Sequence, residues 1–330
     1  MTEALLKVSN LHKDFAVTSG LFQRFSKRKV SAVNDVSFSI ERGKTMGLVG
    51  ESGSGKSTIG RCLIRLINPT SGTIDFNGID ILTLKGEDLF RFRREAQIVF
   101  QDPQASLNPR MTIGELVSEP LVIHKTGTKA ERIAAVKELL ETVGLNPEHI
   151  NRYPHEFSGG QRQRIGIARA LALRPKLIIC DEPVSALDVS IQAQVLNLLD
   201  SLQTEFGLTY LFIAHDLGVV QHISDTVAVM YLGTLVETAD VDPLYATPCH
   251  PYTQSLLSAI PVPDPEMQRS RSRILLQGEV PSPIDPPSGC RFRTRCPIVK
   301  DVCSAERPEL REILPGHFCA CHFAKPNPLS

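Results

Sequence analysis

Short apolar runs alternate along this chain with segments of helical periodicity. The runs 45–49, 177–182 and 209–214 are almost entirely apolar and end at glycine or polar residues. Runs of this kind predict strands buried on both faces, as in a parallel sheet. Apolar residues at helical spacing follow over 58–66 and 190–206. The alternation therefore predicts an α/β fold.

Three parts of the pattern depart from this alternation. Alternating apolar residues at 5–8 and 37–40, with a turn, strand and turn over 71–78, predict an antiparallel β subdomain. Helical spacing over 113–143 predicts a helical subdomain at about 103–165. From 261 to 287 prolines recur, which disfavours a regular sheet. We predict two domains, 1–260 and a small, loop-rich, Cys-rich domain over 261–330.

The stretch from Gly50 to Thr58 fits G-x-x-x-x-G-K-[ST], the phosphate-binding P-loop. A predicted strand precedes it and a predicted helix follows, which is the context that this motif requires. Glycines let the backbone wrap a phosphate, and the helix N-terminus faces the anion. Lys56 would reach the β- and γ-phosphates of a nucleotide, and the Ser57 hydroxyl would bind Mg²⁺. A chance glycine-rich turn is the less favoured interpretation.

Polar residues end the other predicted strands. Gln101 follows the run 98–100, Asp181 and Glu182 end the run 177–182, and His215 follows the run 209–214. Open α/β sheets bind ligands at the carboxyl ends of their strands. Alone, His215 would be interpreted as a polar cap on a strand end. The ring of Phe15, after the first strand, could stack on a purine or pack in the core.

Composition narrows the class of partner. Basic and acidic residues number 36 each, which argues against DNA or RNA as a general partner. Apolar runs fall well short of the roughly 18 residues of a membrane span, and the N-terminus lacks a signal-peptide pattern. We therefore expect a cytosolic protein, unless a partner holds it at a membrane. The basic stretch 18–30 is interpreted as a solvated hairpin or loop.

In a reduced compartment the eight cysteines are interpreted as buried thiols or metal ligands rather than disulfides. Cys62 and Cys180 fit small buried hydrophobes. Five of the other six cluster near the end of the chain: Cys290, Cys296, Cys303 and Cys321 have the spacing C-x5-C-x6-C-x17-C, and Cys319 is a fifth thiol. This is not the paired C-x2-C of common zinc ribbons, and spacing alone leaves zinc and an iron–sulfur cluster open.

Taken together, the motifs resemble the ATP-binding subunit of ABC transporters over almost the whole chain. The resemblance implies a P-loop NTPase core, with Gln101 as the Q-loop glutamine and Ser158-Gly159-Gly160-Gln161 as the ABC signature. It also implies a D-loop ending at Asp188, a switch histidine at His215 and adenine stacking on Phe15. The nucleotide contacts then comprise Gly50, Ser52, Gly53, Gly55, Lys56, Ser57, Thr58, Gln101 and Asp181.

The resemblance also implies catalytic roles. Lys56 and the loop amides hold the phosphates, while Ser57, Gln101 and Asp181 bind Mg²⁺. Glu182 polarises the attacking water, and His215 bridges the γ-phosphate and Glu182. ATP bound to a partner's P-loop is contacted by the signature residues Ser158, Gly159, Gly160 and Gln161, and by Asp188. ATP then lies at a head-to-tail interface that closes on binding and reopens on hydrolysis.

Further motifs are similar to the importers of dipeptides and oligopeptides. They are the run 100–110, His250-Pro251-Tyr252-Thr253 and the Cys-rich tail. The insertion before 32–38 and Met230-Tyr231-Leu232-Gly233 look more like the F-type subunit of the paired D and F ATPases. The implied partners are a D-type ATPase, two membrane permeases and, indirectly, an extracytoplasmic binding protein. The implied location is the cytoplasmic face of the inner membrane.

Two questions remain open at this point. The substrate could be nickel or another small solute, and exporters or soluble ABC ATPases of DNA repair or translation are less favoured. For the tail, the resemblance implies a [4Fe–4S] cluster with a structural role, with zinc as the alternative. The family pattern matches Gly316 to His322, which makes Cys321 the fourth ligand and puts Cys319 at an apolar position.

Overall fold

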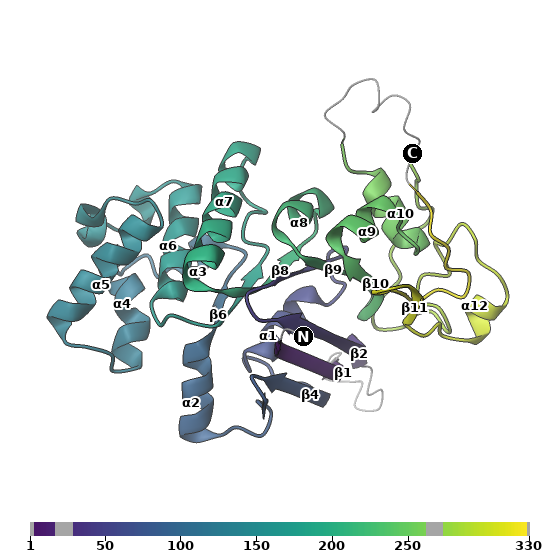
Figure 1. Cartoon of the computed structure of the whole chain (residues 1–330), viewed down its shortest axis with the longest axis horizontal. Coiled ribbons are helices and arrows are strands. Elements are labelled where there is room, and N and C mark those ends of the chain that lie inside the picture. Colours follow the sequence, from purple (N-terminus) through teal and green to yellow (C-terminus); the bar gives the residue numbers. More distant parts are fainter. Residues whose placement is uncertain (1–2, 17–28, 262–272, 329–330) are drawn as a thin grey trace, which may run out of the picture. The chain divides into compact units, whose positions relative to one another are not determined.

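The computed structural model describes residues 3–16, 29–261 and 273–328 (Figure 1). Their contacts group into two compact units. One comprises 1–5, 40–45 and 76–213, and the other comprises 6–39, 46–75 and 214–330. Most of the basic stretch 18–30 lies outside the described residues, so its predicted loop stays a prediction. The proposed domain boundary near residue 260 likewise stays a prediction.

The first unit contains three parallel strands in a row, β6 (Ala96–Val99), β7 (Leu177–Asp181) and β8 (Thr209–Ala214, up to residue 213). Every residue of β7 and β8 is buried, as the unbroken apolar runs predict. The register pairs Val99 with Cys180 and Asp181 with Ile213. The carboxyl ends of β6 and β7 therefore lie side by side, at the positions that Gln101 and Glu182 follow.

Helices make up most of the rest of this unit. They are α2 (Gly86–Glu95), α3 (Pro103–Ser106), α4 (Ile113–Ile123), α5 (Lys129–Thr142), α6 (Gly159–Leu171) and α7 (Val189–Phe206), with the 3₁₀ turns η1 (Pro147–Asn151) and η2 (Pro154–Glu156) and the short strand β5 (Ile79–Asp80). Helices α4, α5 and α6 contact one another (Figure 1). The helical prediction for 113–143 is confirmed, but the segment is two helices.

The break between α4 and α5 has a local cause. Lys125 and Gly127 adopt left-handed backbone angles, with φ of 52° and 65°, which a continuous helix does not allow. Thr128 then starts α5 with a capping box, because its hydroxyl accepts from the Glu131 amide while the Glu131 carboxylate accepts from the Thr128 amide. Residues 124–132 carry no apolar side chain larger than alanine, so the break is marked in the sequence by Gly127 and by the Thr128–Glu131 capping pattern.

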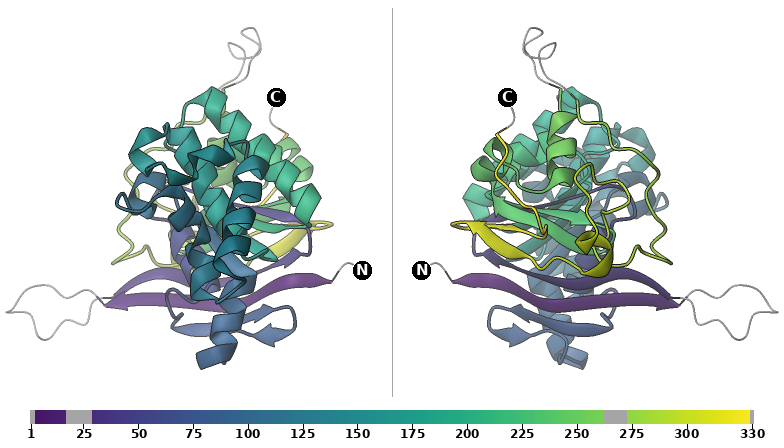
Figure 2. Two further views of the ribbon diagram at one scale, coloured as in Figure 1. Left: turned by 90° about the vertical axis from the view of Figure 1, so that its left-hand side faces the viewer. Right: turned by 90° about the vertical axis from the view of Figure 1, so that its right-hand side faces the viewer.

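The second unit contains a sheet of β2 (Lys29–Glu41), β1 (Ala4–Ala16) and β4 (Ser71–Phe76), in that order (Figure 2). It corresponds to the predicted β subdomain, with strands much longer than the predicted 5–8 and 37–40. The additional residues of β1 and β2 are mostly half-buried or exposed, so they carry a weak apolar pattern. Helix α1 (Lys56–Leu63) follows β3 (Thr45–Val49) directly after the P-loop.

A second sheet in this unit joins residues far apart in sequence. Strand β3 runs parallel to β9 (Thr226–Tyr231), and β9 pairs antiparallel with β10 (Thr234–Asp240). This confirms the predicted hairpin around Leu232-Gly233. Strand β10 pairs with β12 (His317–Cys319), which pairs with β11 (Arg311–Leu314). The remaining helices are α8 (Leu217–Ile223), α9 (Val241–Ala246), α10 (Pro251–Ser258) and α12 (Val302–Ala305).

The tail thus contributes strands to a regular sheet (Figure 2), contrary to what its prolines predicted. The physical reason is their position, because none of the tail's prolines falls within 311–314 or 317–319. From 273 to 310 the tail is mostly turns and loops, as expected. Among the described residues, helices that combine the length and apolarity of a membrane span are absent.

Candidate functional site

The P-loop has the predicted strand–loop–helix form. Strand β3 is buried along its length, and α1 begins at Lys56 after Gly55. Gly50 and Gly55 have φ of 155° and 107°. A Cβ at Gly50 would lie 2.2 Å from the Met230 carbonyl oxygen, and one at Gly55 would lie 2.1 Å from that of Ala32. Side chains at these two positions would break the loop, because the backbone passes too close to its neighbours.

The loop is arranged to receive an anion. Lys56 is 4% exposed, and its Nζ donates to the carbonyl oxygens of Gly50 at 2.7 Å and Glu51 at 3.0 Å. The buried Ser54 Oγ has no hydrogen-bond partner among the described residues. The first turn of α1 carries no acidic residue that would repel a phosphate. These features fit a nucleotide phosphate with its Mg²⁺.

In the other unit, the ends of β6 and β7 bring two predicted residues together. The Gln101 side-chain amide donates to Glu182 Oε2 at 2.9 Å. Glu182 has φ of 48°, an uncommon backbone for a residue with a side chain, and its amide donates to the Ile213 carbonyl at 2.9 Å. Asp181 beside it is 2% exposed. A carboxylate held in this way after a buried strand is suited to binding metal or water.

The signature residues open α6. Ser158 Oγ accepts from the Gln161 amide at 3.3 Å, and the Gln161 side chain accepts from the Ser158 amide at 3.0 Å. This capping box fixes the turn, so that the exposed Gly159 and the half-buried Gly160 form the helix N-terminus. A Cβ at Gly160 would lie 2.4 Å from the Ile191 side chain. The motif is therefore preformed and accessible, as an anion site for another chain requires.

The other predicted nucleotide residues are accessible. His215 follows β8 and is exposed, and Asp188 is the exposed N-cap of α7. Phe15 is 38% exposed near the end of β1, with Lys13 Nζ at 4.9 Å from its ring centre, so it is not a core residue. The predicted convergence of the P-loop with Gln101, Asp181, Glu182 and His215 on one nucleotide stays a prediction. Cys62 and Cys180 are fully buried, as predicted.

The tail cysteines differ in the charged groups around them, although Cys319 and Cys321 pack in one buried cluster with Cys249. Burial raises the pKa of the Cys296 thiol to about 11, and negative charge on Cys321, Cys290 and Cys303 adds to the shift. Burial likewise raises the pKa of Cys321, with contributions from Cys290 and Cys303. These four thiols therefore lie close enough for their charges to interact electrostatically. Burial also raises the pKa of Cys319, but there the largest charge contribution comes from Glu237.

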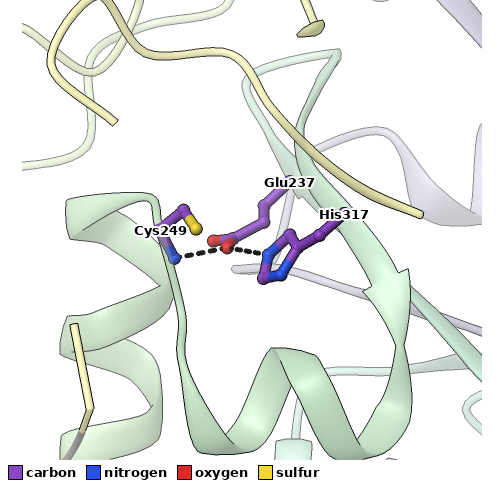
Figure 3. Close-up of side chains that lie close together, drawn as sticks. All are labelled: Glu237, Cys249 and His317. Carbon is purple, nitrogen blue, oxygen red and sulfur yellow. Dashed lines mark hydrogen bonds and ion pairs between the residues drawn. The ribbon is translucent and has the colours of Figure 1, made fainter. Parts of the chain in front are cut away.

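Beside Cys319 lies a buried network that sequence reasoning missed, and Figure 3 shows its residues Glu237, Cys249 and His317. Glu237 pairs with Cys319 across β10 and β12, and His317 Nε2 lies 2.7 Å from Glu237 Oε1. The Glu237 carboxylate also accepts from the backbone amides of Cys249 at 2.5 Å and His250 at 3.0 Å. Glu237 and His317 are 0% exposed. A glutamate ending a fully buried apolar run was the available sequence signal, because such a charge needs buried partners.

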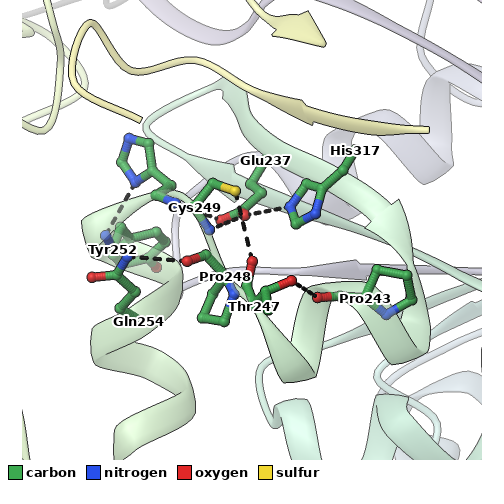
Figure 4. A network of polar contacts seen from close by, with 9 residues as sticks. Glu237, Pro243, Thr247, Pro248, Cys249, Tyr252, Gln254 and His317 are labelled. Atoms are coloured by element: carbon green, nitrogen blue, oxygen red, sulfur yellow. Dashed lines mark hydrogen bonds and ion pairs between the residues drawn. The ribbon is translucent and has the colours of Figure 1, made fainter. Parts of the chain in front are cut away.

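The network extends into the turn before α10 (Figure 4). His250 Nδ1 accepts from the Tyr252 amide at 3.1 Å, and Cys249 Sγ lies 3.6 Å from the Thr247 carbonyl oxygen. Ligand atoms of Glu237, Cys249 and His317 lie within 4.8 Å of one another, a donor set that a divalent ion accepts. Because the carboxylate already interacts with two amides and the imidazole, we interpret the network as the anchor of β12 on β10.

A P-loop, a glutamate after a buried parallel strand and a glycine pair that opens a capped helix are motifs typical of an ATP-binding cassette. Two family models match the chain: "ABC transporter" over residues 33–185 and "Oligopeptide/dipeptide transporter, C-terminal region" over residues 236–303. The dimeric cassette MJ0796, solved with ADP and Pi, matches with a TM-score of 0.63 at 30% identity, covering 72% of this chain and 98% of that one.

Two proteins of Bacillus subtilis are similar over nearly the full length. YkfD is 57% identical over 97% of this chain and 95% of its own. The oligopeptide transport ATP-binding protein AppF is 57% identical over 97% of this chain and 98% of its own. The chain therefore belongs to the ATP-binding subunits of ABC transporters, in the group with the oligopeptide/dipeptide transporter C-terminal region, and it is an ATPase that uses ATP and Mg²⁺. The predicted family and fold class are confirmed.

Proposed function

We propose that the chain is the ATP-hydrolysing subunit of a membrane importer of dipeptides or oligopeptides, the F-type member of its pair. The observation that carries this proposal is the presence, in one chain, of a built phosphate loop and the C-terminal region that this transporter group shares. Relatives that are 57% identical bear the name of oligopeptide transport. The second candidate substrate is nickel or another small solute.

The site residues divide the work of hydrolysis. Lys56, the glycines of the loop, Ser52 and Thr58 hold the phosphates, and Ser57, Gln101 and Asp181 bind Mg²⁺. Glu182 orients the attacking water and His215 holds the γ-phosphate, while Phe15 stacks on adenine. The contact between Gln101 and Glu182 supports this assignment, because it places a metal ligand beside the candidate base.

The partner of this chain is a second, D-type ATPase in head-to-tail contact. Ser158, Gly159, Gly160, Gln161 and Asp188 would act on ATP held by that partner. The exposed, preformed N-terminus of α6 supports this assignment, because within its own chain it carries an anion site open to solvent. The pair would sit on two permeases at the cytoplasmic face of the inner membrane and act on substrate delivered by an extracytoplasmic binding protein.

For the tail we propose a [4Fe–4S] cluster on Cys290, Cys296, Cys303 and Cys321. The Cys290 amide donates to the Cys303 carbonyl oxygen at 2.8 Å, so the fold brings two of these cysteines together from distant positions in the tail, which supports a shared site. A single zinc ion would draw its thiolates closer together, to about 4 Å from Zn–S bonds of ~2.3 Å. Among the described residues, three ligand atoms come within 4.8 Å of one another only in the network of Glu237, Cys249 and His317. The family resemblance favours the four-iron cluster, with zinc as the alternative.

Reconstitution tests the importer. The chain would be purified with the ATPase and permeases encoded beside it and placed in vesicles with the cognate binding protein. We expect uptake of a labelled dipeptide or oligopeptide that depends on ATP, with ATPase activity stimulated by the loaded binding protein. Uptake of Ni²⁺ in place of any peptide would contradict the peptide assignment. Failure of the chain to co-purify with permeases would contradict the whole proposal.

A further inference from the structure

Glu51 is the P-loop residue whose surroundings the nucleotide site does not explain. It directly follows Gly50, and its carbonyl oxygen accepts from Lys56 Nζ. Its amide donates to the Tyr252 hydroxyl at 3.0 Å. Its carboxylate accepts from Arg295 Nη1 at 2.9 and 3.0 Å to the two oxygens. One loop residue is thus held by its carbonyl, its amide and its side chain.

The groups that hold Glu51 are themselves rigid. Tyr252, Tyr231 and Phe292 are almost fully buried and pack ring against ring, with centres 4.9 to 5.4 Å apart. The Arg295 guanidinium lies 6.0 Å from the centre of the Tyr231 ring. Its side chain is 10% exposed, and that of Glu51 is 27% exposed. A charge pair so shielded from water is stronger than one on an open surface.

Arg295 belongs to the loop that carries two of the four tail cysteines. It lies between Cys290 and Cys296, and its amide donates to the Phe292 carbonyl at 3.0 Å. The Cys290 amide donates to the Cys303 carbonyl at 2.8 Å, which closes the loop on a third cysteine. A cluster bound by these thiols would fix the ends of the loop, and with them the guanidinium on Glu51.

We propose that Arg295 is a positioning residue for the P-loop, through which the metal site of the tail sets the affinity of this chain for ATP. With Arg295 on Glu51, the backbone of Gly50 and Glu51 is held in the form that receives phosphate. When the ion pair is lost, the nucleotide itself must order the loop. The entropy lost on ordering the loop then weakens ATP binding. The link from metal to Arg295 rests on the proposed cluster, whereas the link from Arg295 to the P-loop does not.

The first experiment measures ATP binding by the full-length chain with a fluorescent ATP analogue. Arg295→Met keeps an unbranched stem of about the length of the arginine's aliphatic part and removes the guanidinium and its charge. We expect its dissociation constant to rise about tenfold, within the range typical of coupling between sites. We expect kcat at saturating ATP to change little, because the residues proposed for the chemistry are untouched. Arg295→Lys should recover part of the affinity.

Arg293→Met is the matched control, since Arg293 lies in the same loop but donates to Ser288 within the tail. We expect wild-type affinity from this variant. Glu51→Gln should weaken ATP binding as Arg295→Met does, and the double variant should be no worse than either single one. Equal losses from Arg293→Met and Arg295→Met, or additive losses in the double variant, would overturn the positioning role.

The second experiment compares metal-loaded and metal-depleted protein after removal of the chelator. In the wild type we expect depletion to weaken ATP binding by a factor close to that of Arg295→Met. In Arg295→Met itself depletion should add nothing further. A wild type that binds ATP equally well in both states would refute the link to the metal site. A chain that carries no metal when purified anaerobically would instead refute the proposed cluster and leave the first experiment to decide on Arg295.

Discussion

At the scale of single residues, function in this chain depends on backbone strain and on buried charge. Glu182 occupies a left-handed backbone conformation directly after a buried strand, and the Gln101 amide holds its carboxylate. Non-glycine residues keep such a conformation only where the surroundings enforce it, and these places are often functional sites. Glu182 is therefore the side chain whose replacement tests the chemistry most directly.

We expect Glu182→Gln to bind ATP with near wild-type affinity and to hydrolyse it at least about 100-fold more slowly, since the group that orients water is lost. The measurement is phosphate release by the purified transporter at saturating ATP, with binding followed separately. Glu156→Gln is a suitable control, because that exposed carboxylate serves only to cap η2. Turnover by Glu182→Gln within a few-fold of wild type would exclude Glu182 from its proposed role.

His250 gives a second prediction at this scale. Burial lowers its pKa to about 4, and the nearby Glu237 only partly opposes this. Its Nδ1 must stay unprotonated to accept from the Tyr252 amide. The unfolded chain binds the proton near pH 6.5, so stability from this group is complete above that pH and falls as the pH drops towards 4. At pH 4 the loss approaches about 3 kcal/mol.

The measurement is urea unfolding at several pH values between 7 and 4.5, compared with His250→Asn. Asparagine can cap α10 but does not titrate, so the variant should lose less stability over this range. The exposed His155 supplies the control, since His155→Asn should follow the wild type. Identical pH dependence in wild type and His250→Asn would show that folding leaves the pKa of this imidazole unchanged, which would contradict the prediction.

How much of the site the sequence predicts depends on whether its residues are neighbours along the chain. The P-loop and the signature are continuous, so spacing alone identifies them, and the structure gives both the predicted backbone form. Glu237, His317, Glu51 and Arg295 come from distant segments and meet only through folding. Periodicity carries no information on such pairs. The only sequence signal for them is a charged residue beside buried apolar residues. This signal predicts that the charge has a buried partner but does not identify which residue it is.

At the scale of elements, strand β12 determines which tail cysteine faces which environment. Side chains alternate along a strand, so His317 and Cys319 share the face that meets Glu237. Cys321 lies two residues beyond β12 and joins the environment of Cys290 and Cys303. Sequence could not decide between the two thiols except through a family pattern, because they are only two residues apart. The strand register explains why Cys319 meets Glu237, and the choice of Cys321 as the fourth ligand rests on the family pattern.

We therefore expect Cys321→Ser to lose most of the bound iron and Cys319→Ser to retain it. Wild-type protein purified without oxygen should be brown and contain about four iron per chain, as Cys₄ ligation of a [4Fe–4S] cluster requires. Iron and zinc would be quantified in all three proteins. Iron lost from Cys319→Ser and kept by Cys321→Ser would reverse the assignment, and stoichiometric zinc in a colourless wild type would refute the cluster.

At the scale of the whole molecule, the proposed function gives the signature a partner chain whose ATP it serves. The signature at the start of α6 is ordered by its own capping box and needs no ligand to form. A preformed anion site that stays exposed is of use only when another molecule brings the phosphate. Hydrolysis of ATP at one subunit's P-loop should therefore depend on the signature of the other subunit, which cannot happen in an isolated cassette.

The prediction concerns Ser158→Ala in the assembled importer. We expect this variant to impair hydrolysis of ATP bound at the partner's P-loop, while ATP at its own P-loop is still hydrolysed. The measurement is trapping of labelled nucleotide with vanadate, resolved by subunit after cross-linking. Lys56→Ala in this chain is the matched comparison, since it should abolish trapping at its own P-loop instead. Loss of trapping only at this chain's own P-loop in Ser158→Ala would show that the signature acts within its own chain and would end the head-to-tail assignment.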